Sequence, residues 1–175
     1  MESIVARNAR LPVFGWKEHV ELPEWGLRLR AKLDTGARTS ALHIGDLTEL
    51  GEVRDPDTGE RRRRVRFDVV LGTRTKPVHH EIEALVVGDR RVRDTRARPE
   101  HRLLVRTRIV CGPLDTDAEV SLTDRSGMNF RMLLGRLTLA GHGLVDPQHG
   151  YLQTDRAAQR GAVRGALRPT IGSRP

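Results

Sequence analysis

The chain has 175 residues, of which 31 are Lys or Arg and 23 are Asp or Glu, so its formal net charge is +8 with neutral histidines. This length favours a single domain, and with only 3% aromatic residues the core must be built mainly from Val, Leu and Ile. No stretch approaches the roughly 18 apolar residues of a membrane-spanning helix, and no signal-peptide pattern is present, so we expect a soluble, cytoplasmic protein without a membrane partner.

Short runs of alternating or apolar residues predict a succession of β-strands. The pattern is strictest in Leu-Arg-Leu-Arg-Ala-Lys-Leu at residues 27–33, directly before Asp34. Gly, Pro and Asp gather between the runs, where turns are expected. In chain order the strands are predicted at residues 14–22, 27–33, 40–44, 65–71, 78–87, 103–110, 118–122, 130–136 and 151–152. The turns are predicted at residues 23–26, 55–60, 88–89, 124–127 and 145–147.

Two hairpins are expected in the middle of the chain. The first closes through the turn at residues 55–60, and we interpret the four arginines at 61–64 as a solvated strand or turn edge rather than a nucleic-acid site. The second is a long, Arg-rich hairpin at residues 89–110 with its tip near residues 96–99. A short helix is expected to begin at residues 137–140.

The domain organisation follows from composition. Residues 1–13 are mostly polar and predict a flexible N-terminal arm, and residues 14–152 contain the strands of one domain. Residues 153–175 are rich in Arg, Gly, Ala and Pro without periodicity, which predicts a basic, disordered tail. Strands separated by turns, with almost no helical period, predict an all-β barrel or sandwich.

The single cysteine, Cys111, excludes an intrachain disulfide and fits a reducing compartment. Its apolar neighbours indicate an inert thiol in the core. The positive charge would attract nucleic acid, an anionic surface or a glutamate-rich peptide. An Arg-rich composition without functional meaning explains the charge equally well.

The candidate catalytic residues are in Asp34-Thr35-Gly36-Ala37, which follows the strand at residues 27–33. In an aspartic protease such an Asp occupies a tight turn that needs Gly, the Thr hydroxyl bonds across to an opposing loop, and a small residue such as Ala37 fits where two loops meet. Two such carboxylates share one proton, so that one is a general base on water and the other polarises the scissile carbonyl. The alternative is an ordinary Asp in a turn at a strand end.

The triplet Asp-Thr-Gly occurs a second time, at residues 57–59, where no apolar strand precedes it and turn residues surround it. We interpret this copy as a turn. The two copies are 23 positions apart, which is too short for a second lobe. The partner of Asp34 is therefore expected to be Asp34 of another chain, in a homodimer with twofold symmetry.

A second feature, about 100 residues after Asp34, supports this interpretation. The segment Leu134-Gly135-Arg136 matches the hydrophobic-Gly-Arg segment that retropepsins place beside the catalytic turn. We expect Leu134, Gly135 and Arg136, together with Ala37, to brace the turn. Retropepsins usually have an acid just after the turn to pair with this Arg, but here the position is Arg38. Arg136 must then bind Asp124 or a main-chain carbonyl.

Residues 32–43 and 122–136 closely resemble the bacterial family named ATP-dependent zinc proteases, and Gly15-Trp16 and residues 145–147 also fit it. The resemblance covers roughly residues 14–152. It implies a retropepsin-like closed barrel with one lobe per chain, and an aspartic endopeptidase with Asp34, Thr35 and Gly36 at its site. Some members are associated with an ATP-grasp ligase that adds glutamates to a ribosomal protein. The resemblance thus implies a glutamate-rich peptide substrate, and that ligase or a ribosomal protein as a partner.

The sequence itself gives little support to zinc or ATP. The zincin motif needs two His four positions apart on a helix, whereas residues 79–84 lack the second His and alternate like a strand. No Gly-rich phosphate loop is present. We expect neither a metal nor a cofactor, and keep a zinc-dependent peptidase as an alternative.

The hairpin at residues 89–110 is the natural candidate for a flap over the substrate. Arg96 and Arg98 at its tip would bind substrate carboxylates through bidentate pairs, or are ordinary exposed arginines. A further alternative for the whole chain is a non-catalytic, basic binding module of the same fold, on ribosomes or RNA.

Overall fold

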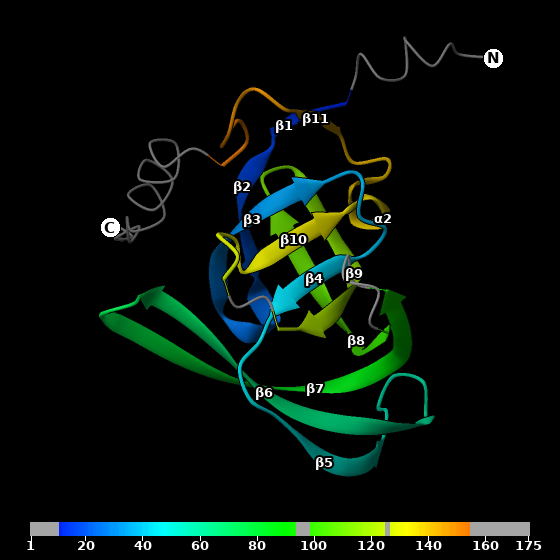
Figure 1. Ribbon diagram of the computed structural model, residues 1–175. Coiled ribbons are helices and arrows are strands. Elements are labelled where there is room, and N and C mark those ends of the chain that lie inside the picture. The colour runs from blue at the N-terminus through cyan, green and yellow to red at the C-terminus, as the bar shows by residue number, and fades with distance from the viewer. Residues whose placement is uncertain (1–10, 94–98, 125–126, 155–175) are drawn as a thin grey trace, which may run out of the picture.

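The computed structural model describes residues 11–93, 99–124 and 127–154, and almost all of its regular structure is β (Figure 1). A single 3-10 turn at Pro23–Trp25 and the short helix α2 (Arg136–Leu139) are the described helices. The strands are β1 (Val13–Gly15), β2 (Lys17–Leu22), β3 (Leu27–Asp34), β4 (Ser40–His43), β5 (Leu47–Arg54), β6 (Arg61–Thr73), β7 (Lys76–Arg93), β8 (Pro99–Cys111), β9 (Leu114–Thr123), β10 (Met132–Gly135) and β11 (Leu144–Asp146).

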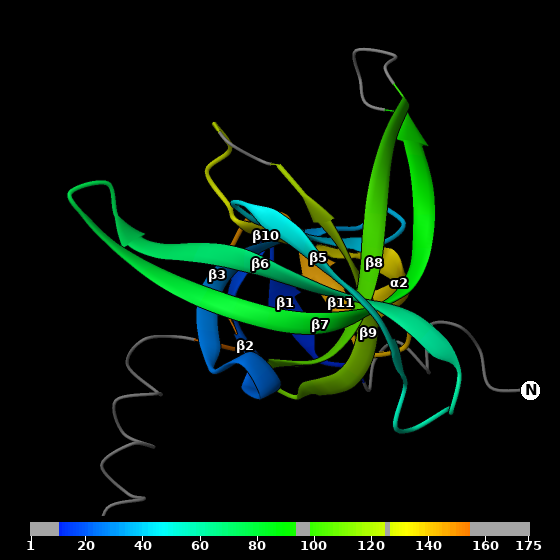
Figure 2. The ribbon, with the colours of Figure 1, turned by 90° about the horizontal axis from the view of Figure 1, so that it is seen from below.

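Six of these strands close into a barrel. They are hydrogen-bonded in the order β2-β3-β10-β4-β9-β8, and β8 returns to β2 through the pair Glu21 and Val110. The prediction of an all-β, closed barrel is therefore confirmed. β7, β6 and β5 extend the sheet beyond β8, and Figure 2 shows the β6–β7 and β7–β8 hairpins leaving the barrel in different directions.

β3 shows why the sequence forms this barrel. Its leucines and alanine point into the core and are at most 6% exposed, whereas the cations between them point outward. This alternation is the period of a strand with one buried face. The buried positions of β3 are Leu27, Leu29, Ala31 and Leu33.

The lone cysteine is part of the same core. Cys111 is 1% exposed, and desolvation by burial is the main cause that raises the pKa of its thiol to about 12. The thiol stays protonated at neutral pH, in agreement with an inert core residue.

Three local predictions were wrong. The turn at residues 88–89 does not form, because β7 continues through it with a bulge after Val86, where its partner changes from β6 to β8. The turn at residues 145–147 is largely the strand β11, which pairs in parallel with β1. The strand at residues 151–152 is absent, because Tyr151 has a left-handed φ of 61° and its ring stacks on His19.

A buried carboxylate ties the end of the described chain to the barrel. Glu18 is 0% exposed and accepts hydrogen bonds from the backbone N–H of Gly15 at 2.7 Å, the N–H of Gln153 at 3.1 Å and the hydroxyl of Thr154. Contacts with the barrel therefore reach Thr154, which is itself buried. Most of the predicted arm, residues 1–10, and the tail from residue 155 lie outside the described residues.

We expect Glu18→Ala to lower the free energy of unfolding by about 3 kcal/mol, because it leaves buried donors without an acceptor. Urea unfolding followed by circular dichroism measures this. Glu21→Ala is the matched control, since Glu21 is exposed on the same strand and its ion pair with Arg28 spans 3.7 Å. Equal losses in the two variants would contradict the role given to Glu18.

Among residues 11–93, 99–124 and 127–154, no helix combines the length and the apolar composition that crossing a membrane requires.

Candidate active site

Asp34 is the last residue of β3, and its carboxylate is held by the turn that follows. Its Oδ1 atom accepts hydrogen bonds from the backbone N–H groups of Gly36 at 3.1 Å and Ala37 at 3.2 Å. The side chain is 29% exposed, and its other oxygen, Oδ2, lies 3.4 Å from Nζ of Lys32. Two fixed donors thus orient the carboxylate and leave one oxygen open to the surface.

β10 lies in parallel beside β3 and reaches the same turn. The register pairs Leu134 with Leu33 and Gly135 with Asp34. Beyond the strand, the N–H of Arg136 donates to the carbonyl of Ala37 at 2.9 Å, and the N–H of Leu137 donates to that of Arg38 at 3.1 Å. The segment from Leu134 to Arg136, separated from Asp34 by about 100 residues, is therefore joined directly to the Asp34 turn.

Gly135 is needed at this junction because the two segments approach closely. A Cβ atom on Gly135 would lie 2.4 Å from the carbonyl carbon of Thr39, 2.6 Å from its oxygen and 2.9 Å from the nitrogen of Ser40. All three are backbone atoms, so no side chain can move aside.

Arg136 has the main-chain partner that we considered for it. Its Nη1 atom lies 3.5 Å from the carbonyl oxygen of Gly36, within the Asp34 turn. Asp124, the other candidate partner, has a carboxylate oxygen 3.6 Å from Nδ1 of His43.

A buried hydroxyl network behind the turn was missed by the sequence reasoning. The Ser40 hydroxyl lies 2.7 Å from that of Thr138 and accepts the N–H of Gly135 at 3.1 Å, while Ser121 donates to the Ser40 carbonyl at 3.0 Å. All three hydroxyl residues are buried. The sequence did contain a signal for this network. One small hydroxyl residue, Ser40, follows the Asp34 turn, and another, Thr138, follows Gly135-Arg136.

A cavity of about 440 Å³ lies in front of Asp34. Lys32, Asp34 and Leu133 form its wall, and the loop at residues 127–130 forms its rim. Asp34 is the only acidic residue among the described residues that line it. The cavity gives a bound molecule access to the carboxylate.

The second Asp-Thr-Gly triplet is a turn, as expected. It connects β5 to β6, and the carboxylate of Asp55 accepts the backbone N–H of Asp57 at 2.9 Å and of Thr58 at 3.3 Å. The Asp57 N–H is the largest cause that holds the pKa of Asp55 below its usual value, with the nearby Arg62 adding to it. Gly59 has a φ of 73°, as a turn glycine does.

The remaining candidates are placed as follows. Thr35 is exposed in the Asp34 turn. Arg96 and Arg98 lie outside the described residues. In the described part of the chain, no three His, Cys, Asp or Glu side chains gather as a metal site would require. His79 lies on β7, where its Nδ1 atom is 2.6 Å from Asp68.

Comparison with known proteins adds to this geometry. Residues 13–156 match the family model described as RimB-like, retropepsin-like aspartic endopeptidase RimB. That description names neither zinc nor ATP, so the family resemblance is supported for its aspartic part alone.

Two curated relatives are both named probable alpha-L-glutamate ligase. The chain is 33% identical to the one from Parasynechococcus marenigrum, over 89% of this chain and 32% of the relative, and 27% identical to the one from Shewanella pealeana, over 79% and 29%. The chain thus spans about a third of the length of the curated relatives it matches.

A solved structure has the same fold. The crystal structure of a Legionella pneumophila protein of unknown function (DUF785) aligns with a TM-score of 0.64 and 29% identity. The alignment covers 81% of this chain and 98% of that one.

Proposed function

The chain belongs to the RimB-like family of retropepsin-like aspartic endopeptidases, and on this premise we propose that it hydrolyses peptide bonds as a homodimer, with Asp34 of each subunit in one shared site. The observation that carries the proposal is the Asp34 carboxylate, fixed by two backbone N–H groups and facing a cavity. Thr35 and Gly36 shape the turn, and Ala37, Leu134, Gly135 and Arg136 brace it.

The homodimer is proposed because one lobe offers one carboxylate. Asp34 is the sole acid among the described residues that line its cavity. The second Asp-Thr-Gly triplet forms the turn between β5 and β6 and does not line this cavity. A twofold axis beside Asp34 would bring a second copy of the same carboxylate to the site.

The reaction then follows from two carboxyl groups that share one proton. The ionised carboxylate removes a proton from a water molecule as its oxygen attacks the carbonyl carbon of the scissile bond. The protonated carboxyl group donates its proton to the carbonyl oxygen, which gives a tetrahedral diol. As the C–N bond breaks, the proton taken from water passes to the leaving amine, and a hydroxyl proton of the diol returns to a carboxylate so that the pair again shares one proton. The products are a carboxylic acid and an amine, and no cofactor is consumed.

We propose a glutamate-rich peptide as the substrate, such as a tail on a ribosomal protein, and a glutamate ligase in the cytoplasm as the partner. Support comes from the net charge of +8 and from the ligase names of the relatives. A ligase that adds glutamates would create the tail, and this chain would shorten it.

The test is cleavage of a peptide with an oligoglutamate tail, with and without EDTA, followed by mass spectrometry across acidic to neutral pH. We expect release of tail fragments that EDTA does not change. Activity that disappears in EDTA and returns with zinc would support a metallopeptidase instead. The absence of cleavage of this peptide and of a mixed peptide library would contradict the endopeptidase proposal.

A further inference from the structure

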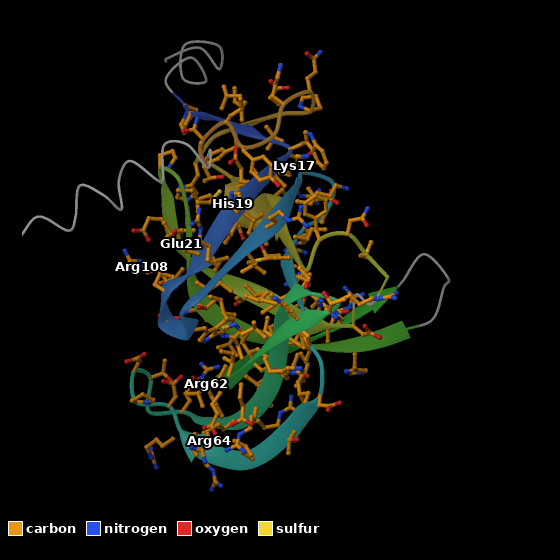
Figure 3. All side chains as sticks on the ribbon, turned by 90° about the vertical axis from the view of Figure 1, so that its left-hand side faces the viewer. Lys17, His19, Glu21, Arg62, Arg64 and Arg108 are labelled. Carbon is orange, nitrogen blue, oxygen red and sulfur yellow. The ribbon has the colours of Figure 1, made fainter. Side chains whose placement is uncertain are left out.

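The arginines in the described part of the chain differ in whether an acid lies close to them. Several of those on the sheet formed by β5 to β9 pair with carboxylates on a neighbouring strand or turn, and Figure 3 shows Arg62, Arg64 and Arg108 among them. Examples are Arg63 with Asp89 at 2.5 Å and Arg66 with Glu83 at 2.7 Å.

The outer face of β3 is different. Arg28, Arg30 and Lys32 are exposed at every second position and lead along the strand to Asp34. Among the described residues, Arg30 has no carboxylate within 4.0 Å, and the same holds for Arg131, the residue just before β10. The nearest acid to Arg28 is the exposed Glu21, at 3.7 Å. Arg28 and Lys32 thus have acids within 4.0 Å, Glu21 and Asp34, and Arg30 is the cation of β3 without one among the described residues.

Three of these cations, Arg28, Arg30 and Arg131, line a cavity of about 610 Å³, which we call the basic cavity. Its lining contains five basic side chains and no Asp or Glu among the described residues, and Asp124, outside the lining, lies 3.6 Å from His43. The register of β2 and β3 places His19 beside Arg30, and Figure 3 shows His19 on β2 between Lys17 and Glu21. The five are His19, Arg28, Arg30, His43 and Arg131.

The basic cavity adjoins the cavity in front of Asp34. Gly127, Met128 and Asn129 line both, so the two lie along one loop. An extended peptide bound at Asp34 would reach the basic cavity by running along this loop.

We propose that the basic cavity is a carboxylate-binding subsite, in which Arg30 and Arg131 bind acidic side chains of an extended peptide whose scissile bond lies at Asp34. This inference rests on the proposed function and adds to it the residues that select the substrate. A guanidinium group offers two parallel N–H donors that match the two oxygens of a carboxylate. In Arg30 and Arg131 no acid among the described residues uses these donors.

The position of Arg30 on a strand suits an extended peptide. Side chains two residues apart on β3 repeat at roughly 6.6 Å, as do the side chains on one face of an extended peptide, whereas Arg131 lies outside this strand. Single-stranded nucleic acid is usually held by aromatic side chains on which bases stack. No Phe, Tyr or Trp is among the described residues that line the basic cavity, and two nearby rings are engaged with its lining: Tyr151 stacks on His19, and the centroid of the Phe130 ring lies 6.0 Å from the Arg30 guanidinium carbon.

The experiment measures binding rather than cleavage, in the Asp34→Asn background so that the probe stays intact. A fluorescent dodecapeptide in which Glu alternates with Ala is titrated by anisotropy, beside a peptide with Gln in place of Glu. We expect Arg30→Gln and Arg131→Gln each to weaken binding of the Glu peptide by about tenfold or more. Arg61→Gln, which removes an exposed arginine paired with Glu52 on the far sheet, should change it by less than about twofold.

Three results would overturn the inference: equal binding of the Glu and Gln peptides, unchanged binding in both Arg30→Gln and Arg131→Gln, or tighter binding of a single-stranded RNA dodecamer. Melting temperatures equal to that of the parent exclude unfolding as the cause of a loss. If the wild type cleaves no peptide but Arg30→Gln and Arg131→Gln still weaken binding of the Glu peptide, the proposed activity is refuted and the subsite is supported. If the wild type cleaves the peptide but both variants bind it with unchanged affinity, the subsite alone is refuted.

Discussion

Asn in place of Asp34 is expected to lower kcat/KM for peptide hydrolysis by about 10⁴-fold or more, because it removes both the general base and the shared proton from the site. The fold should persist. An amide oxygen can accept the same two N–H groups, from Gly36 and Ala37, and the lost ion pair with Lys32 is exposed and worth little. Cleavage rates and thermal melting, measured on the same preparations, separate activity from stability.

The chain provides a matched control for this substitution in its second Asp-Thr-Gly triplet. Asp57→Asn changes the same residue type in the same tripeptide, but in the β5–β6 turn. We expect its activity to equal that of wild type. Retention of activity in Asp34→Asn, or an equal loss in both variants, would refute the catalytic role of Asp34.

Ala in place of Gly135 is expected to lower the free energy of unfolding by about 3 kcal/mol. The added Cβ would lie 2.4 to 2.9 Å from backbone atoms of Thr39 and Ser40, and relief requires β10 to move away from the Asp34 turn. That movement would also disturb the hydrogen bond from the Gly135 N–H to the Ser40 hydroxyl. Activity should fall together with stability.

The control for Gly135 is Gly45→Ala, where the nearest atoms to a new Cβ lie at an ordinary 3.6 Å, in Asp68. We expect this variant to change the unfolding free energy by less than about 1 kcal/mol. Denaturant unfolding compares the two directly. Equal stabilities of the Gly135 and Gly45 variants would contradict the close approach seen at the turn.

The parts of the fold that local patterns specify could be predicted from the sequence. The strict alternation of residues 27–33 specified β3 and its buried face, because a strand with one face in the core has a period of two. The position of Gly135 beside Asp34 followed from a motif rather than from periodicity. Its reason, the absence of room for a Cβ atom, is visible only in the folded chain.

The parts that depend on pairing between distant strands could not be predicted. The bulge in β7 after Val86 arises because that strand changes partners, and a Gly-Asp pair in the sequence resembles a turn equally well. The pairing of Arg66 with Glu83 depends on the register of β6 and β7. For the same reason the sequence could not predict that Arg30 and Arg131 lack a nearby acid among the described residues. Composition gives only the net charge of the chain.

The central claim is that two subunits each contribute Asp34 to one site, and mixing subunits tests it most directly. A fixed amount of wild type is denatured and refolded with increasing amounts of Asp34→Asn, so that the subunits assort at random. A shared dyad predicts that activity falls to about one half at equal amounts and to about one tenth at a roughly ninefold excess of the variant, because mixed dimers have only one Asp34. Activity that stays constant as the variant is added would show that each chain acts alone, and would contradict the account.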